Sequence, residues 1–536
     1  MTAELPLVVE NLSFRYRDRE GLAIKNLSFA AHPGEILLIA GASGCGKTTL
    51  IRCINGLIPR SYKGEVSGRI LLHGQDIAGW PLSKVSQTVG TVLQDPERQI
   101  LGTKVLNEVA FGLENLGLPR PEIIRRADAA LDYLNISALR LRETFNLSGG
   151  EKQKVALAGV LAMQPRVLLL DEPLASLDPA SASETLGMVR RLADEGMTVL
   201  MVEHRVEDVL GIRPERVMFL SDGEIRYLGP LDGLGEAVNY REVKLPADVI
   251  IRRAKADPAP AALDILPGVK GEPAPIVRFE EVAFDYEAGA EVLHGISLEI
   301  KRGDVIAVLG PNGAGKTTFV KHAIGLLKPK SGRVLVDGRD TRQASVAQIA
   351  GTLGYVFQSP SHMLFAPTVY EELSFGPKNL KHPKDEIEKE VKEALQIVNL
   401  AEKEKDPPLA LSFGQQKRVS IAAILAMRSR ILVMDEPTAG QDYQNYMNFM
   451  DSILQLPGFE AVLFITHDVD LAVIYANRVL LLADGRLVAD GPPQDVLRDP
   501  ERLKACRLVP SSLLRANLER LDRTGHFLRA EALAHV

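Results

Sequence analysis

The sequence predicts an α/β protein that consists of two tandem repeats, each built on a mostly parallel β-sheet. One observation is that polar residues recur in the same order, since Lys47 and Glu172 return as Lys316 and Glu436 at offsets of 269 and 264 residues. The other is that short apolar runs alternate with longer helical patterns in both halves, which is typical of buried parallel strands joined by helices. The repeat, rather than the length of 536 residues, therefore sets the number of domains.

Three apolar runs in the first repeat predict strands of this parallel sheet. They are Glu35–Ala40, which precedes a glycine-rich loop, Arg166–Leu170 and Met197–Val202. The opening of the repeat differs, because Leu7–Glu10 and Phe14–Tyr16 resemble strands of an added antiparallel layer. Each repeat is long enough to bury a core of its own.

Composition shifts divide the chain into four parts. They are a first domain at 1–245, a proline-rich linker at 246–275, a second domain at 276–505 and a C-terminal helical tail at 506–536. Five prolines between residues 257 and 275 disfavour helices and strand ladders there. In the tail, Leu514, Leu518 and Leu521 follow a helical spacing, which predicts a helix packed on the second repeat or, alternatively, a partner-binding helix.

The overall composition is that of an ordinary soluble globular protein, with 46% hydrophobic and 25% charged residues. The net charge of −6 gives no basic field, so we expect no nucleic-acid partner. No window reaches the roughly 18 apolar residues needed for a direct membrane span, and Met1–Pro6 does not start a signal peptide. The three cysteines, Cys45, Cys53 and Cys506, fit neither a zinc site nor a disulfide framework, which agrees with a reducing cytosol. Any membrane role must therefore involve a partner.

Two segments, Gly41–Thr48 and Gly310–Thr317, fit the P-loop pattern, and each follows an apolar strand. The glycines let backbone N–H groups surround a β-phosphate at a helix N-terminus, and the lysines reach the β- and γ-oxygens. The residues expected to hold ATP are Gly41, Ser43, Gly44, Cys45, Gly46, Lys47, Thr48 and Thr49 in the first repeat. Their counterparts are Gly310, Asn312, Gly313, Ala314, Gly315, Lys316, Thr317 and Thr318. The hydroxyls of Thr48 and Thr317 are expected to ligate Mg²⁺.

Two further strands, Val167–Asp171 and Ile431–Asp435, end in paired carboxylates. Ligands of open α/β sheets bind at this carboxyl end. The first acid of each pair, Asp171 or Asp435, suits the shell of Mg²⁺. The second, Glu172 or Glu436, suits a catalytic base for the attacking water, and removal of such a base costs roughly 10²–10⁴-fold in rate.

The segments Leu147–Glu151 and Leu411–Gln415 identify a family, because they resemble the signature motif of ABC-type ATPases. The resemblance implies two tandem ABC-ATPase domains, each with a P-loop sheet core, an antiparallel β layer and a helical signature subdomain. It also implies an intramolecular pseudo-dimer in which the signature of one repeat covers the nucleotide of the other. The signature residues expected to contact ATP are Ser148, Gly149 and Gly150, which pair with Lys316, and Ser412 and Gly414, which pair with Lys47.

The same resemblance assigns roles to three more pairs of residues. They are Tyr16 and Tyr286 for stacking on adenine, Gln94 and Gln358 for the γ-phosphate, the metal and the membrane partner, and His204 and His467 as catalytic switch histidines that bond the γ-phosphate.

Two positions depart from the family pattern in the second repeat. Phe413 replaces the first signature glycine, and Gln441 replaces the apolar residue kept as Leu177 in the first repeat. If position 413 needs a positive φ, its phenylalanine is strained by about 1–3 kcal/mol. We expect both sites to turn over, at unequal rates.

Three short motifs are similar to the energy-coupling-factor subgroup, which comprises prokaryotic importers of vitamins and of cobalt or nickel. They are Phe111–Leu116, Phe375–Leu380 and Glu203–Arg205. The resemblance implies an ATP-hydrolysing translocase subunit that needs ATP and Mg²⁺ and lies peripherally on the cytoplasmic face of the cell membrane. Its partners would be an integral-membrane scaffold subunit and a substrate-binding membrane subunit, the latter recognising the transported substrate.

Two glutamates, Glu108 and Glu372, each lie 14 residues after the glutamine of their repeat. They are candidate partners for arginines of the scaffold subunit. The alternative is that they are carboxylates favoured at a helix N-terminus.

Two other classes of ABC protein are considered. A tandem sugar-importer ATPase usually has a degraded second P-loop, whereas Lys316 and Thr317 are intact. A soluble ABC protein that acts on ribosomes carries a long, charged helical linker, whereas the segment 257–275 is rich in proline and poor in basic residues.

Overall fold

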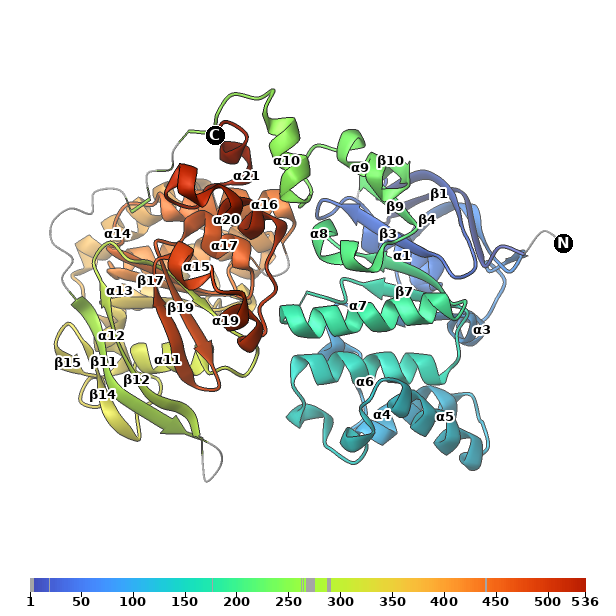
Figure 1. Ribbon diagram of the computed structural model, residues 1–536, viewed down its shortest axis with the longest axis horizontal. Coiled ribbons are helices and arrows are strands. Elements are labelled where there is room, and N and C mark those ends of the chain that lie inside the picture. The colour runs from blue at the N-terminus through green and yellow to red at the C-terminus, as the bar shows by residue number, and fades with distance from the viewer. Residues whose placement is uncertain are drawn as a thin grey trace. The chain divides into compact units, whose positions relative to one another are not determined.

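The computed structural model describes residues 4–18, 20–175, 177–261, 263, 265–266, 275–286, 291–438 and 441–536. The chain divides into two compact units, which are coloured from blue to green and from green to red in Figure 1. Unit 1 comprises Met1–Val249 with Gly440–Tyr446, and unit 2 comprises Ile250–Ala439 with Met447–Val536.

Unit 1 is built on a six-stranded sheet in which all neighbouring strands are parallel except the β10–β9 pair. Its strands, in spatial order, are β10 (Glu224–Gly229), β9 (Arg216–Ser221), β3 (Ile36–Gly41), β8 (Thr198–Val202), β7 (Val167–Asp171) and β6 (Val89–Val92). The three strands that the apolar runs predict are β3, β7 and β8, and every residue of these strands is buried. Burial on both faces explains why their sequences are continuously apolar instead of alternating.

A second, four-stranded sheet of unit 1 is antiparallel, as the opening of the repeat predicts. Its order is β2 (Ile24–Ala31), β1 (Leu7–Tyr16), β4 (Gly64–Leu72) and β5 (Gln75–Asp76). The two sheets share one hydrophobic core with the first helix, in which Leu7 and Phe14 join Leu50, Ile51 and residues of the parallel sheet. The antiparallel layer is therefore an integral part of the first domain.

Helices surround these sheets, and those of one group form a separate helical part of unit 1. The helices are α1 (Lys47–Ile54), α2 (Leu57–Arg60), α3 (Leu82–Thr88), α4 (Val105–Asn115), α5 (Arg120–Tyr133), α6 (Gly149–Ala162), α7 (Pro179–Asp194), α8 (Val206–Val209) and α9 (Leu231–Ala237). In Figure 1, α4, α5 and α6 lie together below α7, and they correspond to the expected helical signature subdomain.

Unit 2 repeats this architecture. Its mostly parallel sheet has the order β16 (Leu353–Val356), β17 (Ile431–Asp435), β18 (Ala461–Ile465), β13 (Val305–Leu309), β19 (Arg478–Ala483) and β20 (Arg486–Gly491). Its antiparallel sheet has the order β12 (Glu291–Lys301), β11 (Pro275–Asp285), β14 (Ser331–Val336) and β15 (Arg339–Asp340). The prediction of two tandem domains of one fold class is confirmed.

The helices of the second repeat follow the same sequence of elements. They are α11 (Lys316–Ala323), α12 (Val346–Ala350), α13 (Val369–Asn379), α14 (Lys384–Ile397), α15 (Phe413–Ala426), α16 (Tyr443–Leu454), α17 (Val469–Tyr475), α18 (Pro493–Val496) and α19 (Pro500–Ala505). In the parts of the chain for which helices are given, none combines the length and the apolar character needed to cross a bilayer.

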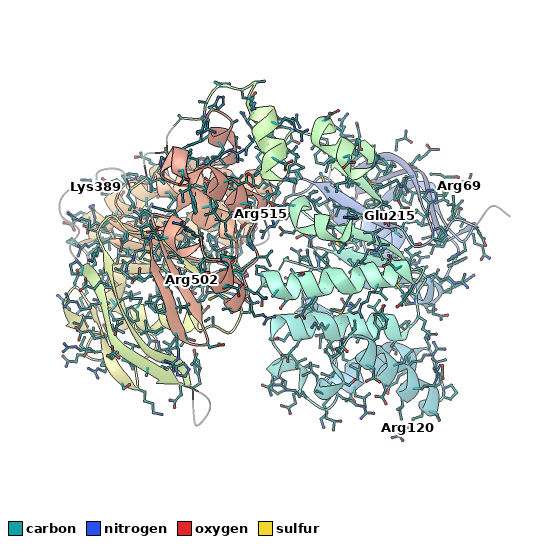
Figure 2. All side chains as sticks on the ribbon, viewed as in Figure 1. Arg69, Arg120, Glu215, Lys389, Arg502 and Arg515 are labelled. Carbon is teal, nitrogen blue, oxygen red and sulfur yellow. The ribbon has the colours of Figure 1, made fainter. Side chains whose placement is uncertain are left out.

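Polar contacts fix the start of the central strand of unit 1. Glu215, labelled in Figure 2, accepts a hydrogen bond from the Ile36 N–H at 2.7 Å. Glu35, only 4% exposed, accepts two hydrogen bonds from the guanidinium of Arg216 at 2.5 and 2.9 Å. A buried carboxylate is stable only when it is paired in this way. These contacts therefore hold the start of β3 next to the start of β9.

The linker and the tail both contain helices. Residues Ala247–Ala254 form α10, which precedes the proline-rich stretch, while 262, 264 and 267–274 of the predicted linker lie outside the described residues. The tail forms α20 (Ser512–Thr524) and α21 (Ala530–Leu533). Leu514 is fully buried, and the guanidinium of Arg529 pairs with Asp451, so the tail packs on unit 2. The domain boundaries themselves stay a prediction.

Candidate nucleotide-binding sites

Each P-loop connects the end of a central strand to the N-terminus of a helix. In unit 1 the loop runs from β3 to α1, and Gly46 precedes α1 with a left-handed φ of 110°. At Gly41 a Cβ atom would lie 2.2 Å from the carbonyl oxygen of Leu220, so only glycine fits. Gly310 is in the same situation, with its Cβ position 2.1 Å from the Leu482 carbonyl oxygen. The glycine spacing therefore has a steric cause in both repeats.

The P-loop lysines lie inside their loops. Lys47 Nζ donates to the carbonyl oxygens of Gly41 and Ala42, both at 2.8 Å. Lys316 Nζ donates to Gly310 and Pro311 at 2.7 and 2.8 Å. The two ammonium groups are thus held at equivalent places, next to backbone N–H groups that can bind an anion.

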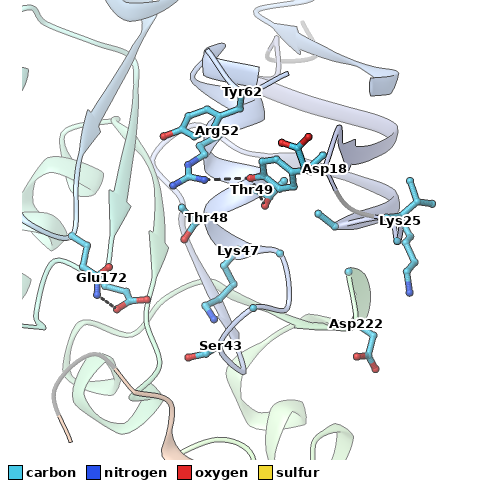
Figure 3. Close-up of a pocket in the computed structure, with 18 of the residues that line it drawn as sticks. Asp18, Lys25, Ser43, Lys47, Thr48, Thr49, Arg52, Tyr62, Glu172 and Asp222 are labelled. Carbon is cyan, nitrogen blue, oxygen red and sulfur yellow. Dashed lines mark hydrogen bonds between the residues drawn. The ribbon is translucent and has the colours of Figure 1, made fainter. Parts of the chain in front are cut away.

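A cavity of about 790 Å³ opens beside the P-loop of unit 1. Its lining includes Tyr16, Lys47, Thr48, Arg52, Tyr62, Gln94, Glu172 and His204. Figure 3 shows Arg52 between Tyr62 and the P-loop helix, with Glu172 across the cavity. This size suits a nucleotide-sized ligand.

The predicted adenine-side tyrosines both reach the first turn of the P-loop helix. The hydroxyls of Tyr16 and Thr49 lie 3.1 Å apart, and those of Tyr286 and Thr318 lie 3.2 Å apart. Arg52 donates to the Tyr16 hydroxyl at 3.3 Å. Whether the rings stack on adenine stays a prediction.

The predicted catalytic residues are in direct contact in both repeats. His204 Nε2 lies 2.8 Å from Glu172 Oε1, and its Nδ1 lies 3.1 Å from the Gly41 carbonyl oxygen. In unit 2, His467 Nδ1 lies 3.0 Å from Glu436 Oε1. Each histidine therefore contacts a strand-end glutamate, and His204 also reaches its P-loop.

Gln94 joins the cluster of unit 1 by donating to Glu172 Oε2 at 2.8 Å. Gln358 is exposed, and the described part of unit 2 gives it no such bond to Glu436. The two clusters differ at this position.

Both glutamates adopt a backbone conformation that is rare for a residue with a side chain. Glu172 has a φ of 50° and Glu436 a φ of 44°. Such residues store about 1–3 kcal/mol and occur mainly where the surrounding structure fixes a functional group. Here the N–H of each glutamate donates to the neighbouring strand, at 3.0 Å to Val202 and at 2.9 Å to Ile465.

Electrostatic effects shift the pKa values of the two acids of the first site in opposite directions. Burial would raise the pKa of the Glu172 carboxyl, but its hydrogen bond to His204 and the charges of His204 and Lys47 lower that pKa overall. Burial and the charge of Glu172 raise the pKa of Asp171 to about 6. Glu172 is thus held as a carboxylate, which a proton acceptor must be.

In each repeat, the first strand-end acid and the P-loop threonine hydroxyl fit a magnesium ion. Asp171 Oδ1 is buried and has no hydrogen-bond partner within the described residues, next to the hydroxyl of Thr48. In unit 2, Thr317 Oγ1 donates to Asp435 Oδ2 at 3.4 Å. Carboxylate and hydroxyl oxygens are the ligands that Mg²⁺ prefers, together with phosphate oxygens. Thr48 and Asp171, or Thr317 and Asp435, would hold it.

The signature serines begin the helices α6 and α15. Ser148 accepts from the Glu151 N–H at 3.3 Å, and the Glu151 carboxylate accepts from the Ser148 N–H at 2.8 Å. Ser412 and Gln415 form the same capping box. Both serines are exposed at a helix N-terminus, where an anion is favoured. Their pairing with the P-loop of the other repeat stays a prediction.

Phe413 is not strained. It is the first residue of α15 and does not adopt a positive φ, because Ser412 is the residue that caps the helix. The strain of about 1–3 kcal/mol that a positive φ would impose on Phe413 is therefore absent.

The two glutamates considered as partners for a scaffold subunit are wrong candidates for that role. Glu108 is 8% exposed, and its Oε2 accepts from the N–H groups of Leu101 and Gly102 at 2.7 and 2.6 Å. Glu372 is 5% exposed and accepts from Phe365 and Ala366 at 2.9 and 2.8 Å. Both acids brace the loop before their own helix, so the structural alternative holds.

Three polar contacts of the sites were not predicted from the sequence. Arg52 lies with its guanidinium 4.2 Å from the centre of the Tyr62 ring. The Tyr355 hydroxyl donates to Asp435 Oδ2 at 2.6 Å. Glu203, directly before His204, accepts from the Leu174 N–H at 3.0 Å. Only Glu203 had a sequence signal, since it is an acid at the end of an apolar strand.

Comparison with known proteins gives the same assignment for both repeats. The model of the ABC transporter family matches residues 24–175 and 293–439. A protein of Methanosarcina mazei named "Putative ABC transporter ATP-binding protein" is 36% identical over 94% of this chain and 91% of its own length. A relative of the same description from Caldanaerobacter subterraneus subsp. tengcongensis is 35% identical over 98% of both chains.

A solved structure covers half of the chain. It is cbiO1 from Clostridium perfringens, described as part of the ABC transporter complex cbiONQ, with 34% identity over 49% of this chain and 99% of that one and a TM-score of 0.39. The family match and the relatives, which extend over nearly the whole chain, settle the family. With two P-loops, two strand-end acid pairs and two capped signature helices, this chain belongs to the family of ABC transporter ATP-binding proteins.

Proposed function

We propose that this protein is the ATP-hydrolysing energy-coupling subunit of a membrane importer of vitamins or transition-metal ions, with one ATP at each P-loop. The observation that carries the proposal is the duplicated contact between a strand-end glutamate and a histidine. It occurs at 2.8 Å for Glu172 and His204 and at 3.0 Å for Glu436 and His467. A duplicated, intact set supports hydrolysis in both repeats.

The chemistry that these residues can perform is water activation beside a bound triphosphate. Glu172 is kept ionised by His204 and Lys47, so it can orient a water molecule and accept its proton. The P-loop N–H groups and Lys47 stabilise the charge of the transferred phosphoryl group. Mg²⁺, when bound, neutralises phosphate charge.

ATP binding and hydrolysis would change the positions of the repeats relative to each other. In the proposed pseudo-dimer, Ser412 and Gly414 contact the nucleotide held by Lys47, and Ser148 and Gly150 contact the nucleotide held by Lys316. Because both repeats are in one chain, their closure is intramolecular, with an effective concentration up to the mM range. Loss of the γ-phosphate contacts then favours opening.

Exposed apolar side chains in the segment that follows each glutamine support coupling to a membrane scaffold subunit. In unit 2, Phe365 and Phe375 are 62% and 51% exposed, and their rings meet edge-to-face with centroids 4.9 Å apart. In unit 1, Leu101 and Phe111 are 69% and 45% exposed. Large apolar side chains gathered on the surface mark interaction sites, and Glu372 fixes the loop that carries Phe365.

The importer class rests on the motifs Phe111–Leu116, Phe375–Leu380 and Glu203–Arg205 and on the intact second P-loop. As a member of this class, the protein would lie peripherally on the cytoplasmic face of the cell membrane. Its partners would be the scaffold subunit and a substrate-binding membrane subunit. The cargo is selected by that membrane subunit.

Co-expression tests the partner. The full chain, expressed with a candidate scaffold subunit, should be recovered in the membrane fraction, and it should remain in the soluble fraction without that subunit. The double substitution Phe365→Ala and Phe375→Ala should weaken recovery at least several-fold, while Val488→Ala, which alters an exposed valine elsewhere in unit 2, should not. Sedimentation with ribosomes in place of membranes would overturn the proposal.

ATP turnover tests the base. Glu172→Gln and Glu436→Gln together should reduce kcat by roughly 10²–10⁴-fold. The single variants should retain different rates. Equal residual rates would contradict the expected inequality of the two sites.

A further inference from the structure

A lysine of the signature helix in unit 2 is buried beside the proposed catalytic base. Lys417 lies on α15 and is 2% exposed. Its Nζ donates to the carbonyl oxygen of Pro437 at 2.5 Å, and Pro437 directly follows Glu436 in the chain. The signature helix is therefore bonded to the loop that leaves the base.

Two aromatic rings complete the surroundings of this ammonium group. The ring of Phe413 lies with its centre 5.0 Å from Lys417 Nζ, and the ring of Phe449 lies at 5.6 Å. Both distances are within the range of cation–π attraction. Burial lowers the pKa of Lys417 to about 7, while the charge of Glu436 acts in the opposite direction. An ammonium group removed from water is stable only with such partners, so its position is well defined.

The first repeat has none of these side chains at the equivalent positions. Gln153 stands five residues after Ser148, as Lys417 stands five residues after Ser412, and Gly149 corresponds to Phe413. Over the described part of unit 1, Gln153 makes no bond to the loop after Glu172. There Glu203 holds the loop by accepting a hydrogen bond from the Leu174 N–H.

We propose that Lys417 is a positioning residue for Glu436, and that it ties the signature helix of the second repeat to that repeat's own catalytic loop. Phe413, the departure from the signature pattern, is part of this tie because its ring covers the ammonium group. The inference rests on the proposed function, which makes Glu436 a base and places Ser412 at the nucleotide held by Lys47. In that arrangement, contact at the exposed end of α15 is transmitted to the base of the other site, and the residues described in unit 1 show no matching connection.

Two single substitutions, each used as a background for further variants, allow ATP turnover at each site to be measured separately in the full chain. With Glu172→Gln, ATP turnover reports the site of Glu436, and with Glu436→Gln it reports the site of Glu172. We expect Lys417→Met to lower kcat about five- to tenfold in the first background, with KM for ATP unchanged within about twofold. In the second background, kcat should change by less than about twofold.

Further variants make the test specific. Gln153→Met, the matched change in unit 1, should leave kcat within about twofold in both backgrounds. Phe413→Leu should act in the same direction as Lys417→Met, with a smaller effect. If Lys417→Met does not fold, Lys417→Gln introduces the side chain that the first repeat has at this place and should give the same pattern.

Four outcomes would contradict the proposal. Equal losses in the two backgrounds, or a raised KM with an unchanged kcat, would assign Lys417 to the general stability of unit 2 and overturn the inference alone. Normal turnover in every Lys417 variant would do the same. If Glu172→Gln and Glu436→Gln together keep the wild-type rate, the proposed function itself fails, and the inference fails with it.

Discussion

Replacing Glu203 by glutamine should remove a pH-dependent loss of stability from unit 1. The Glu203 side chain is 4% exposed, and its Oε1 accepts the N–H of Leu174 at 3.0 Å. Burial raises the pKa of this carboxyl to about 8, and the charge of Glu172 acts in the same direction. The folded protein therefore holds a proton that the unfolded chain, with an ordinary glutamate pKa of 4.5, releases.

The sign of the effect follows from proton binding. Because the folded state binds more protons than the unfolded state between about pH 4.5 and 8, the stability of unit 1 falls as the pH rises through this window. A rise of the pKa from 4.5 to about 8 corresponds to a loss of at most about 5 kcal/mol in the free energy of unfolding. Glutamine has the same shape, stays neutral, and can still accept the N–H of Leu174. The variant should thus match the wild type near pH 5 and exceed it near pH 8.

The single tryptophan of the chain makes this measurable in one unit. Trp80 packs against the core of unit 1, so its fluorescence during urea unfolding reports that unit in the full protein. Free energies of unfolding would be compared for wild type and Glu203→Gln at several pH values from about 5 to 8. Glu114→Gln, which makes the same change on an exposed carboxylate of α4, is the control. Parallel pH profiles for wild type and Glu203→Gln would refute the reasoning.

Two further predictions concern other polar contacts. Arg216→Met leaves the carboxylate of Glu35 buried without its two guanidinium bonds, so unit 1 should lose about 3–5 kcal/mol of stability by the Trp80 assay; an unchanged urea midpoint would contradict this. Tyr355→Phe removes the hydroxyl that orients Asp435, and should lower the affinity of the second site for Mg²⁺ by about tenfold. Mg²⁺ titration of fluorescent-nucleotide binding measures this in a chain that also carries Lys47→Ala, which weakens nucleotide binding at the first P-loop. Tyr370→Phe is the control, and an unaltered Mg²⁺ midpoint would be the contrary result.

The sequence was sufficient for the elements whose residues are constrained locally. Nearly continuous apolar runs predicted β3, β7 and β8, since a strand buried on both faces consists mostly of apolar residues. The P-loops were predictable because their glycines are required by close backbone contacts, as at Gly41 and Gly310. The fold class and both P-loops could thus be predicted in full.

The polar contacts that the sequence did not predict depend on the tertiary structure. The bonds of Lys417 to Pro437, of Tyr355 to Asp435 and of Glu203 to Leu174 join residues 20, 80 and 29 positions apart, with no spacing that indicates a pair. Glu108 and Glu372 had two interpretations in the sequence, and their burial decided between them.

The helical conformation of Phe413 follows from a local capping rule that can be applied to the sequence. Ser412 and Gln415 have the spacing of a capping box, in which the serine is the residue before the helix. Position 413 is then the first helical residue and has a helical φ, which any side chain tolerates. The glycine of the usual signature is therefore not required there by the backbone.

The expected inequality of the two ATP sites does not arise from the P-loop lysines or from the histidine–glutamate distances. The P-loop lysines donate to two loop carbonyls at 2.7–2.8 Å in both repeats, and the histidine–glutamate distances differ by only 0.2 Å. Both glutamates also have the same unusual φ. Besides the bond of Gln94 to Glu172, the two repeats differ in how the loop after each glutamate is held. Glu203, which directly follows β8, holds it in the first repeat, and Lys417 of the signature helix holds it in the second. A backbone strain of about 1–3 kcal/mol at each glutamate persists only while such contacts hold it. A change in these contacts is therefore large enough to alter the rate of one site while the other site is unaffected.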